Sequence, residues 1–147
     1  MDIKFTKVEI KDWKVLRTLE EGAASDMFAP CNGEEGYKKY ILESNVFIIT
    51  NENKPMGTIS YKNQDNGLIL INGLTIMPEH RGRGIAKLAM NKLLNEVGNK
   101  NFELVVHPRN TPALLIYLSL GFSIIEWKEN YFGDGEPRLY LQRKAVI

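Results

Sequence analysis

Two glycines and two arginines crowd into the stretch HRGRGIAK, at the start of a segment that otherwise favours a helix. Glycine destabilises a helix interior by about 1 kcal/mol relative to alanine, so Gly82 and Gly84 require a specific reason. A helix N-terminus exposes unpaired backbone N–H groups and the positive end of the helix dipole, and both attract anions. Arg81, Arg83 and Lys87 add positive charge at the same place. The stretch predicts a phosphate-binding turn, and the alternative is a solvated basic turn whose glycines serve loop geometry.

The spacing of this turn excludes the two commonest phosphate-binding motifs. A dinucleotide-binding fingerprint needs a third glycine three residues after Gly84, where the chain has Lys87. A P-loop needs a Gly-Lys-Ser or Gly-Lys-Thr triplet after four intervening residues, and no such triplet follows here. A phosphate site at this turn must therefore belong to another class.

The length and composition indicate one domain, residues 1–147. A chain of 147 residues with 44% hydrophobic and 25% charged side chains can bury a single core. Nineteen Lys and Arg against eighteen Asp and Glu leave a net charge of +1, which gives no general field for binding nucleic acid or an acidic membrane surface. We therefore expect no nucleic-acid partner and no membrane association.

The N-terminal residues and the cysteine content favour a cytoplasmic protein. The stretch MDIKFTKVEI alternates apolar and polar side chains and lacks the apolar core of a signal peptide. No segment approaches the ~20 apolar residues that span a bilayer. The single cysteine, Cys31, excludes an intrachain disulfide, and we interpret it as a small loop or core residue rather than a nucleophile.

Hydrophobic patterns predict a mixed α/β fold, because strands show period-two alternation and helices show apolar residues three and four positions apart. The run 67–77 is apolar enough to be a strand buried on both faces. Gly98 and Gly121 suit the C-terminal ends of two helices, and Thr111 before Pro112 suits a helix start. The predicted elements are a strand at 3–10, helices at 11–23 and 34–44 separated by a loop at 25–33, a hairpin at 45–61, a strand at 67–77, a helix at 85–97, a strand at 102–106, a helix at 111–120, and two strands within 123–144 joined by GDGEP.

The residues around the basic turn match a family motif. LTIMPEHRGRGIAKLAM resembles motif A of the GCN5-related N-acetyltransferases, in which Arg or Gln is followed by two residues, Gly, one residue, and Gly or Ala. The matching residues here are Arg81, Gly84 and Ala86. The preceding Leu-x-Ile-x-Pro-Glu also fits the family pattern.

A second block matches at the expected separation. NTPALLIYLSLGF resembles motif B, Asn-x-x-Ala-x-x-x-Tyr-x-x-x-Gly-Phe, through Asn110, Ala113, Tyr117, Gly121 and Phe122. The order of elements over essentially the whole chain is also similar. The resemblance implies the family's α/β fold: a mixed, mostly antiparallel central sheet of about six to seven strands, helices on both faces, and a splayed pair of strands that forms the acetyl-CoA cleft.

The resemblance also implies acetyl-CoA as cosubstrate. Backbone N–H groups of the turn would face the pyrophosphate, and exposed strand backbone would pair with the pantetheine arm. Asn110 would lie near that arm, although its position equally suits a turn or a helix cap. The implied cofactor-binding residues are Leu74, Ile76, Arg81, Gly82, Arg83, Gly84, Ile85, Ala86, Lys87, Asn110 and Tyr117. No metal site is implied.

Acetyl transfer to an amine needs a neutral amine, a polarised thioester carbonyl and a proton for the departing thiolate. By resemblance, the backbone N–H of Ile76 polarises the carbonyl and Tyr117 supplies the proton. With reference pKa values of about 8.5 for a thiol and 10 for tyrosine, that proton transfer is uphill by roughly 2 kcal/mol. Outside this motif, a tyrosine at position 117 would be interpreted as a core aromatic residue.

The general base is not where the family usually carries it. Many relatives have a glutamate four residues before the Ile76 position, where this chain has Asn72, which cannot accept the proton. Relatives that acetylate protein N-termini often have Leu-Glu-Val in the next strand, where this chain has Leu-Val-Val. Strand alternation places Glu103, Val105 and His107 on one face, which would look into the cleft. We select His107, acting through a water, as the catalytic base, with Glu103 second; a structurally held histidine is the alternative.

The acceptor pocket is expected from the segment 22–36 and from ENYFGDGEPR near the C-terminus. The tail resembles the end of enzymes that acetylate the N-terminal amines of ribosomal or other proteins, so the acceptor is a small amine or a peptide or protein N-terminus. A homodimer is also expected from the frequency of dimers among relatives. Acidic residues near the first segment would favour a cationic amine, although a solvated surface is the simpler interpretation; they are Glu20, Glu21, Asp26, Glu34 and Glu35.

A second hypothesis is a non-catalytic module of the same fold that senses acyl-CoA. It would keep the basic turn and lack the base, as Asn72 and Val105 allow. Tyr117 argues against it, because a sensor needs no acid for a leaving group. Release of free coenzyme A in the presence of amines would distinguish the enzyme from the sensor.

Overall fold

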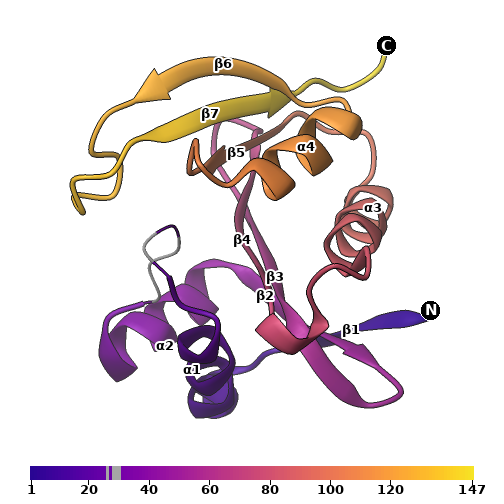
Figure 1. Ribbon diagram of the computed structural model, residues 1–147, viewed down its shortest axis with the longest axis vertical. Coiled ribbons are helices and arrows are strands. Elements are labelled where there is room, and N and C mark those ends of the chain that lie inside the picture. Colours follow the sequence, from indigo (N-terminus) through magenta and orange to yellow (C-terminus); the bar gives the residue numbers. More distant parts are fainter. Residues whose placement is uncertain (26, 28–30) are drawn as a thin grey trace.

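The computed structural model describes residues 1–25, 27 and 31–147 (Figure 1). Within them, seven strands form one sheet in the order β1-β2-β3-β4-β5-β7-β6. The strands are β1 (Ile3–Lys7), β2 (Asn45–Asn51), β3 (Lys54–Asn63), β4 (Ile69–Ile76), β5 (Phe102–Val106), β6 (Ser123–Lys128) and β7 (Arg138–Arg143). The helices are α1 (Trp13–Gly22), α2 (Gly33–Glu43), α3 (Ile85–Val97) and α4 (Thr111–Ser119), with short 3-10 turns η1 (Ile10–Asp12) and η2 (Pro78–His80).

The sheet is antiparallel except at its centre, where β4 and β5 run parallel. Only two register pairs join these strands, Ile69 with Phe102 and Leu70 with Glu103. Beyond Leu70, the two strands continue to Ile76 and Val106 without pairing. The expected mixed sheet and its splayed pair of strands are therefore confirmed.

Helices cover both faces of the sheet, as expected, and each face has its own hydrophobic cluster. One cluster combines β3, β4 and β5 with α3 and α4, through residues such as Ile59, Met90 and Tyr117. The other packs α1 and α2 onto β2 through residues such as Leu16 and Val46. Figure 1 shows α1 and α2 on one side of β2, β3 and β4, and α3 on the other side.

The predicted helices and strands are all present, with shifted ends. The first strand ends at Lys7 rather than continuing to residue 10, because the Glu9 N–H donates to the Asp12 carboxylate (3.0 Å) and starts η1. This turn also delays the first α-helix to Trp13. Part of the expected loop at 25–33 lies outside the described residues, and α2 begins at Gly33.

The prediction that the strand at 67–77 is buried on both faces is wrong, because Asn72 is exposed. The register between β3 and β4 shifts at this point: Ser60 pairs with Gly73 and Tyr61 with Ile71, which leaves Asn72 as the extra residue of a bulge. The Asn72 amide accepts a hydrogen bond from Ser60 Oγ (2.7 Å) and donates one to Ser44 Oγ (2.9 Å). These contacts satisfy a polar side chain within an otherwise apolar strand.

Candidate active site

The turn between β4 and α3 uses its glycines for backbone conformation. Gly82 and Gly84 have φ angles of +78° and +76°, in the left-handed region that L-residues with a Cβ rarely adopt. A Cβ built at either position would meet no atom within 4 Å. The two glycines are therefore required by the path of the chain and leave open space in front of the turn.

The N-terminus of α3 presents unpaired backbone donors. The first hydrogen bond of the helix runs from the Leu88 N–H to the Gly84 carbonyl (3.1 Å), so the N–H groups of Ile85, Ala86 and Lys87 have no acceptor within the helix. No described side chain caps Gly84. The exposed Arg83 adds positive charge beside these donors. The arrangement is suited to an anion such as a phosphate.

Arg81 connects the turn to the rest of the molecule. Its Nε donates to the Ile76 carbonyl (3.1 Å) at the end of β4, and Nη2 donates to the Ala23 carbonyl (3.5 Å) just after α1. The guanidinium therefore lies between the end of β4 and the end of α1. The expected contact of Arg81 with a phosphate remains a prediction.

The unpaired edge of β4, residues 71–76, points its backbone toward β5. The Met77 N–H donates to the Met56 carbonyl (2.9 Å) of β3. Because successive N–H groups of a strand point to opposite edges, the N–H groups of Ile76 and Leu74 point away from β3, toward the side where β5 has separated. This is the orientation that the two predicted pantetheine-binding residues require.

Tyr117 lies on α4 and is buried, with its ring packed against Phe122 at a centroid distance of 6.0 Å. Its hydroxyl makes no hydrogen bond to any described residue. Burial raises the pKa of Tyr117 to about 12. The side chain is therefore a protonated hydroxyl across the neutral range, as a proton donor must be.

Asn110 is the N-cap of α4, and its Oδ1 accepts a hydrogen bond from the Ala113 N–H (3.4 Å). The interpretation of this residue as a helix cap is therefore confirmed. The cap uses the amide oxygen, which leaves the amide NH2 to donate elsewhere. Its contact with a pantetheine arm remains a prediction.

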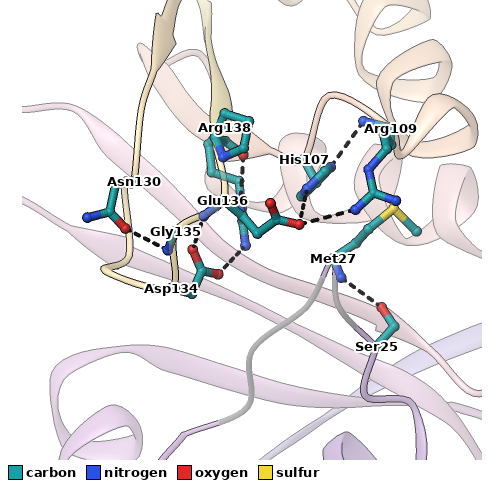
Figure 2. A network of polar contacts seen from close by, with 10 residues as sticks. Ser25, Met27, His107, Arg109, Asn130, Asp134, Gly135, Glu136 and Arg138 are labelled. Carbon is teal, nitrogen blue, oxygen red and sulfur yellow. Dashed lines mark hydrogen bonds and ion pairs between the residues drawn. The ribbon is translucent and has the colours of Figure 1, made fainter.

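His107 is buried directly after β5, and both ring nitrogens have partners within the chain (Figure 2). Nδ1 accepts a hydrogen bond from the Arg109 N–H (3.1 Å), and Nε2 lies 3.4 Å from Glu136 Oε1. A ring nitrogen that accepts a hydrogen bond carries no proton, so neutral His107 holds its proton on Nε2 and directs it at Glu136. These contacts favour a structural role, and the assignment of His107 as base remains a prediction.

Glu103 lies on β5 and also has partners for both carboxylate oxygens. Oε1 accepts from Gln64 Nε2 (2.7 Å), and Oε2 accepts a short hydrogen bond from the Tyr140 hydroxyl. Burial and the bond to Glu103 raise the pKa of Tyr140. Glu103 therefore joins β5 to β7 and to the end of β3, and it is not brought next to His107 by any contact among the described residues.

Glu20 is the residue whose environment the sequence analysis missed. Its side chain is 3% exposed on α1, and its Oε2 accepts a long hydrogen bond from Thr58 Oγ1 of β3 (3.4 Å). Burial raises the pKa of Glu20 to about 7, and the Thr58 hydrogen bond opposes that rise in part. The signal in the sequence is spacing: Leu16 lies four positions and Leu19 one position before Glu20, so the three residues share the buried face of α1.

The other acidic residues near this helix behave as a solvated surface. Glu21 pairs with Arg17 (3.8 Å), and Glu34 pairs with Lys38 (2.9 Å), in each case one helical turn apart and exposed to solvent. Asp26 lies outside the described residues. The interpretation as a solvated face thus holds for Glu21 and Glu34 but not for Glu20.

The environments of Cys31 and His80 bear on their interpretation from the sequence. Cys31 is a free thiol, and burial together with the Glu20 carboxylate raises its pKa to about 11. A thiol with this pKa stays protonated at neutral pH, which agrees with the interpretation of Cys31 as a packing residue. His80 lies in the polar turn before Arg81, where the sequence predicts a solvated side chain with no catalytic role. It is instead half-buried, and its Nδ1 is buried without a partner among the described residues.

Within the described residues, no cluster of three or more His, Cys, Asp or Glu is arranged to hold a metal ion. In the same residues, no helix has the length and apolar character needed to cross a bilayer.

The sequence identifies the family. The sequence profile of the acetyltransferase (GNAT) family matches residues 13–122. The chain belongs to the GNAT family. Both the basic turn and α4 fall inside the matched range.

Solved structures of GNAT proteins share the fold over nearly the whole chain. The ribosomal-protein-S18-alanine N-acetyltransferase from Escherichia coli matches with a TM-score of 0.79 at 16% identity, over 99% of this chain and 96% of that chain. Arabidopsis thaliana Naa50 in complex with the bisubstrate analogue CoA-Ac-MVNAL matches with a TM-score of 0.79 at 18% identity, over 98% and 99% of the two chains. A chimera of the spermidine N-acetyltransferase SpeG from Vibrio cholerae and hSSAT matches with a TM-score of 0.80 at 16% identity, over 98% and 96%. At these identities the likeness shows the fold.

Among curated proteins, an uncharacterized protein of Mycobacterium leprae (strain TN) is 28% identical over 76 residues. The aligned part covers 52% of this GNAT chain and only 21% of that protein. The chain therefore corresponds to a small part of this relative.

Proposed function

We propose that this chain is an acetyl-CoA-dependent N-acetyltransferase, which transfers the acetyl group to a primary amine by direct attack. The observation that carries the proposal is the combination of the unpaired edge of β4 with the uncapped N-terminus of α3. One offers backbone partners for an extended arm, and the other offers donors for phosphates. Acetyl-CoA has both parts in one molecule.

The chain's own residues would hold acetyl-CoA at two places. The backbone from Arg81 to Lys87 would bind the pyrophosphate, supported by the left-handed glycines and the free N–H groups of α3. The backbone of Leu74 and Ile76 would bind the pantetheine arm, supported by the direction of their N–H groups. Asn110 would add a donor from the other side of the separated strands.

The chemistry would need a carbonyl donor and a proton donor. The Ile76 N–H would polarise the thioester carbonyl, because it lies at the end of the unpaired edge. Tyr117 would protonate the thiolate. Against a thiol with a reference pKa of about 8.5, the raised pKa of Tyr117, about 12, makes complete transfer uphill by roughly 5 kcal/mol, so a hydrogen bond that strengthens as the thiolate forms is the expected contribution.

The acceptor would be a small amine or a peptide or protein N-terminus. The structural neighbours include enzymes named for the alanine of a ribosomal protein and for spermidine, and one was solved with an analogue that joins CoA to the peptide MVNAL. The loop between β6 and β7, one of the expected acceptor walls, is organised by hydrogen bonds: Asn130 Oδ1 accepts from the Gly135 N–H (2.6 Å), and Asp134 pairs with the buried Arg138 (3.1 Å), as Figure 2 shows.

The direct test is an assay of free thiol release. Acetyl-CoA is offered together with N-terminal peptides, polyamines and small amines, and the acetylated product is identified by mass spectrometry. We expect turnover with one acceptor class. Acetyl-CoA binding by calorimetry without thiol release from any acceptor would instead support the acyl-CoA sensor, and no binding at all would contradict both functions.

A cytoplasmic location and a homodimer remain predictions. Fractionation of cells that produce the chain tests the location. Light scattering after size-exclusion chromatography tests the assembly.

A further inference from the structure

Four polar side chains gather where α1 and α2 pack on the sheet: Glu20, Tyr37, Thr58 and Thr75. Thr58 of β3 lies directly opposite Thr75 of β4, so their side chains share the face that α1 covers. Thr58 donates to Glu20 Oε2, whereas Thr75 Oγ1 is buried and has no partner among the described residues. From α2, Tyr37 is 0% exposed; its hydroxyl has no partner of ordinary hydrogen-bond geometry among the described residues, and the one hydrogen bond that acts on it, from the Cys31 backbone, lowers the pKa of Tyr37 slightly against the effect of burial. The Glu20 carboxylate lies close enough to contribute to the raised pKa of Tyr37.

This arrangement is unusual for a packed core, where buried polar atoms are almost always hydrogen-bonded. Among the described residues, the Thr75 hydroxyl has no partner, the Tyr37 hydroxyl has only the weak contact with the Cys31 backbone, and the Glu20 carboxylate has one long hydrogen bond. No Lys or Arg among the described residues forms an ion pair with Glu20. An ammonium group has three N–H donors and one positive charge, and it would satisfy the carboxylate and the neighbouring hydroxyl oxygens together.

The position relative to the cofactor-binding residues fits the same interpretation. Thr75 immediately precedes Ile76, whose N–H is the proposed carbonyl donor. The end of α1 contacts the same region, because the Ala23 carbonyl accepts from Arg81, and a Cβ on Gly22 would lie 3.7 Å from the Met77 side chain. Glu20 therefore lies on the α1 and α2 face of β3 and β4, beside the strand end where the acetyl carbonyl is expected.

We propose that Glu20 receives the ammonium group of the acceptor and removes the proton that blocks its attack. This assignment rests on the proposed acetyltransferase function. The Glu20 carboxylate takes one N–H proton, and the freed lone pair forms the C–N bond with the thioester carbon. The C–S bond then breaks, the sulfur is protonated from Tyr117, and the second proton lost from nitrogen restores the Tyr117 hydroxyl. Glu20 returns its proton to solvent, so the products are the amide, the thiol and one proton.

The groups around Glu20 leave it as the one that titrates near neutral pH. From α2, Tyr37 and Tyr40 have pKa values raised by burial, and Cys31 before α2 stays protonated. Thr58 and Thr75 from the sheet do not ionise. The raised pKa of Glu20, about 7, suits a proton acceptor at physiological pH.

The test compares Glu20→Gln with Glu21→Gln in the full chain. Glutamine keeps the shape and an oxygen for the Thr58 hydrogen bond but cannot take a proton, whereas Glu21 is exposed and paired with Arg17. We expect Glu20→Gln to lower kcat/KM by about 100-fold or more and to remove the rise of kcat/KM near pH 7. Its acetyl-CoA affinity, measured by calorimetry, should be unchanged, and it should unfold at no lower temperature than the parent. Glu21→Gln should stay within about twofold of the parent.

A second readout separates proton transfer from simple packing. A peptide N-terminus has a pKa of about 8 and an alkyl amine one of about 10.4, so at pH 9 only the peptide is mostly neutral without help. The defect of Glu20→Gln should therefore shrink at pH 9 with the peptide and persist with the alkyl amine. Full activity of Glu20→Gln, or a defect that is equal at all pH values with both acceptors, would overturn the assignment of Glu20. A parent protein that binds acetyl-CoA but acetylates no amine would overturn the proposed function instead.

Discussion

Glu136 Oε1 lies 3.4 Å from Nε2 of the buried His107, and it thereby joins the loop between β6 and β7 to the end of β5. The same oxygen lies 3.1 Å from Arg109 Nη2. One carboxylate thus holds together two segments that are far apart in the sequence. If the loop is one wall of the acceptor site, its position depends on this carboxylate.

Glu136→Gln should loosen the loop and weaken acceptor binding. The charge-assisted contact with Arg109 is lost, and hydrogen bonds to charged groups contribute about 1.5–3 kcal/mol when sheltered and less when exposed. We expect KM for the acceptor to rise several-fold while acetyl-CoA affinity is unchanged, as measured by steady-state kinetics and calorimetry. Glu126→Gln is the matched control, because its carboxylate is exposed, pairs with Lys128 of the same strand and lies outside the expected acceptor segment. An equal loss in both variants would contradict a specific role for Glu136.

Tyr117→Phe should leave acetyl-CoA binding nearly intact and lower kcat by about 10- to 100-fold, since it removes only the proposed proton donor. Because burial raises the pKa of Tyr117 to about 12, the parent protein should show no loss of activity from Tyr117 ionisation below about pH 11. A pH–rate profile and single-turnover kinetics measure both effects. Turnover equal to that of the parent would assign the proton donor to another group.

Gly84→Glu combined with Arg81→Ala should abolish acetyl-CoA binding, because it places a carboxylate and a bulky side chain at the end of α3 that is proposed to bind the pyrophosphate. Gly84→Ala separates charge from conformation: at φ +76° a Cβ costs about 1–2 kcal/mol of stability without adding charge. We expect a much larger loss of affinity for the charged variant than for the alanine variant. Unchanged calorimetric affinity in the double variant would contradict the phosphate-binding role of the turn.

Glu20 should make the stability of the protein depend on pH. On folding, the pKa of the Glu20 carboxyl rises from 4.5 to about 7, so between these pH values the folded state binds more protons than the unfolded state. The contribution of Glu20 to the stability of the fold is therefore complete below pH 4.5 and is lost as the pH rises toward 7. This rise of the Glu20 pKa from 4.5 to about 7 corresponds to a loss of about 3 kcal/mol in the free energy of unfolding at high pH. Urea unfolding at pH 5 and pH 8 measures it. Glu20→Gln should be more stable than the parent at pH 8 and similar at pH 5, and a parent-like loss between these pH values in Glu20→Gln would assign the effect elsewhere.

The sequence was most informative where local backbone geometry decides the structure. Loop geometry, the alternative explanation for Gly82 and Gly84, is supported by their left-handed φ angles, and α4 was predictable from Thr111 and Pro112 at its start and from Gly121 at its end. The separation of β4 from β5 followed only from family resemblance, because pairing between distant strands leaves no local pattern.

The remaining site features depend on tertiary contacts. From the sequence, Glu20 is one of several charged residues on a polar helix. Its burial could not be predicted without knowing which face of α1 contacts Thr58. His107 looked available as a base because its partner Glu136 lies 29 residues away. The bulge at Asn72 places Leu74 and Ile76 in the same hydrophobic cluster as Ile71, which a simple alternation of strand residues does not predict.

The separated strands have a further consequence for the protein as a folding unit. The sheet of the free chain is incomplete at its centre, since β4 and β5 share only two register pairs. A pantetheine arm bound along the unpaired edge would supply hydrogen bonds that a longer strand pair would otherwise make. The bound coenzyme would therefore extend the sheet between β4 and β5. A ligand at 100 times its dissociation constant stabilises the folded state by about 2.7 kcal/mol. The resistance of the protein to proteolysis would then increase with the concentration of acetyl-CoA. The backbone amide protons of Leu74 and Ile76 would exchange with solvent faster when acetyl-CoA is scarce.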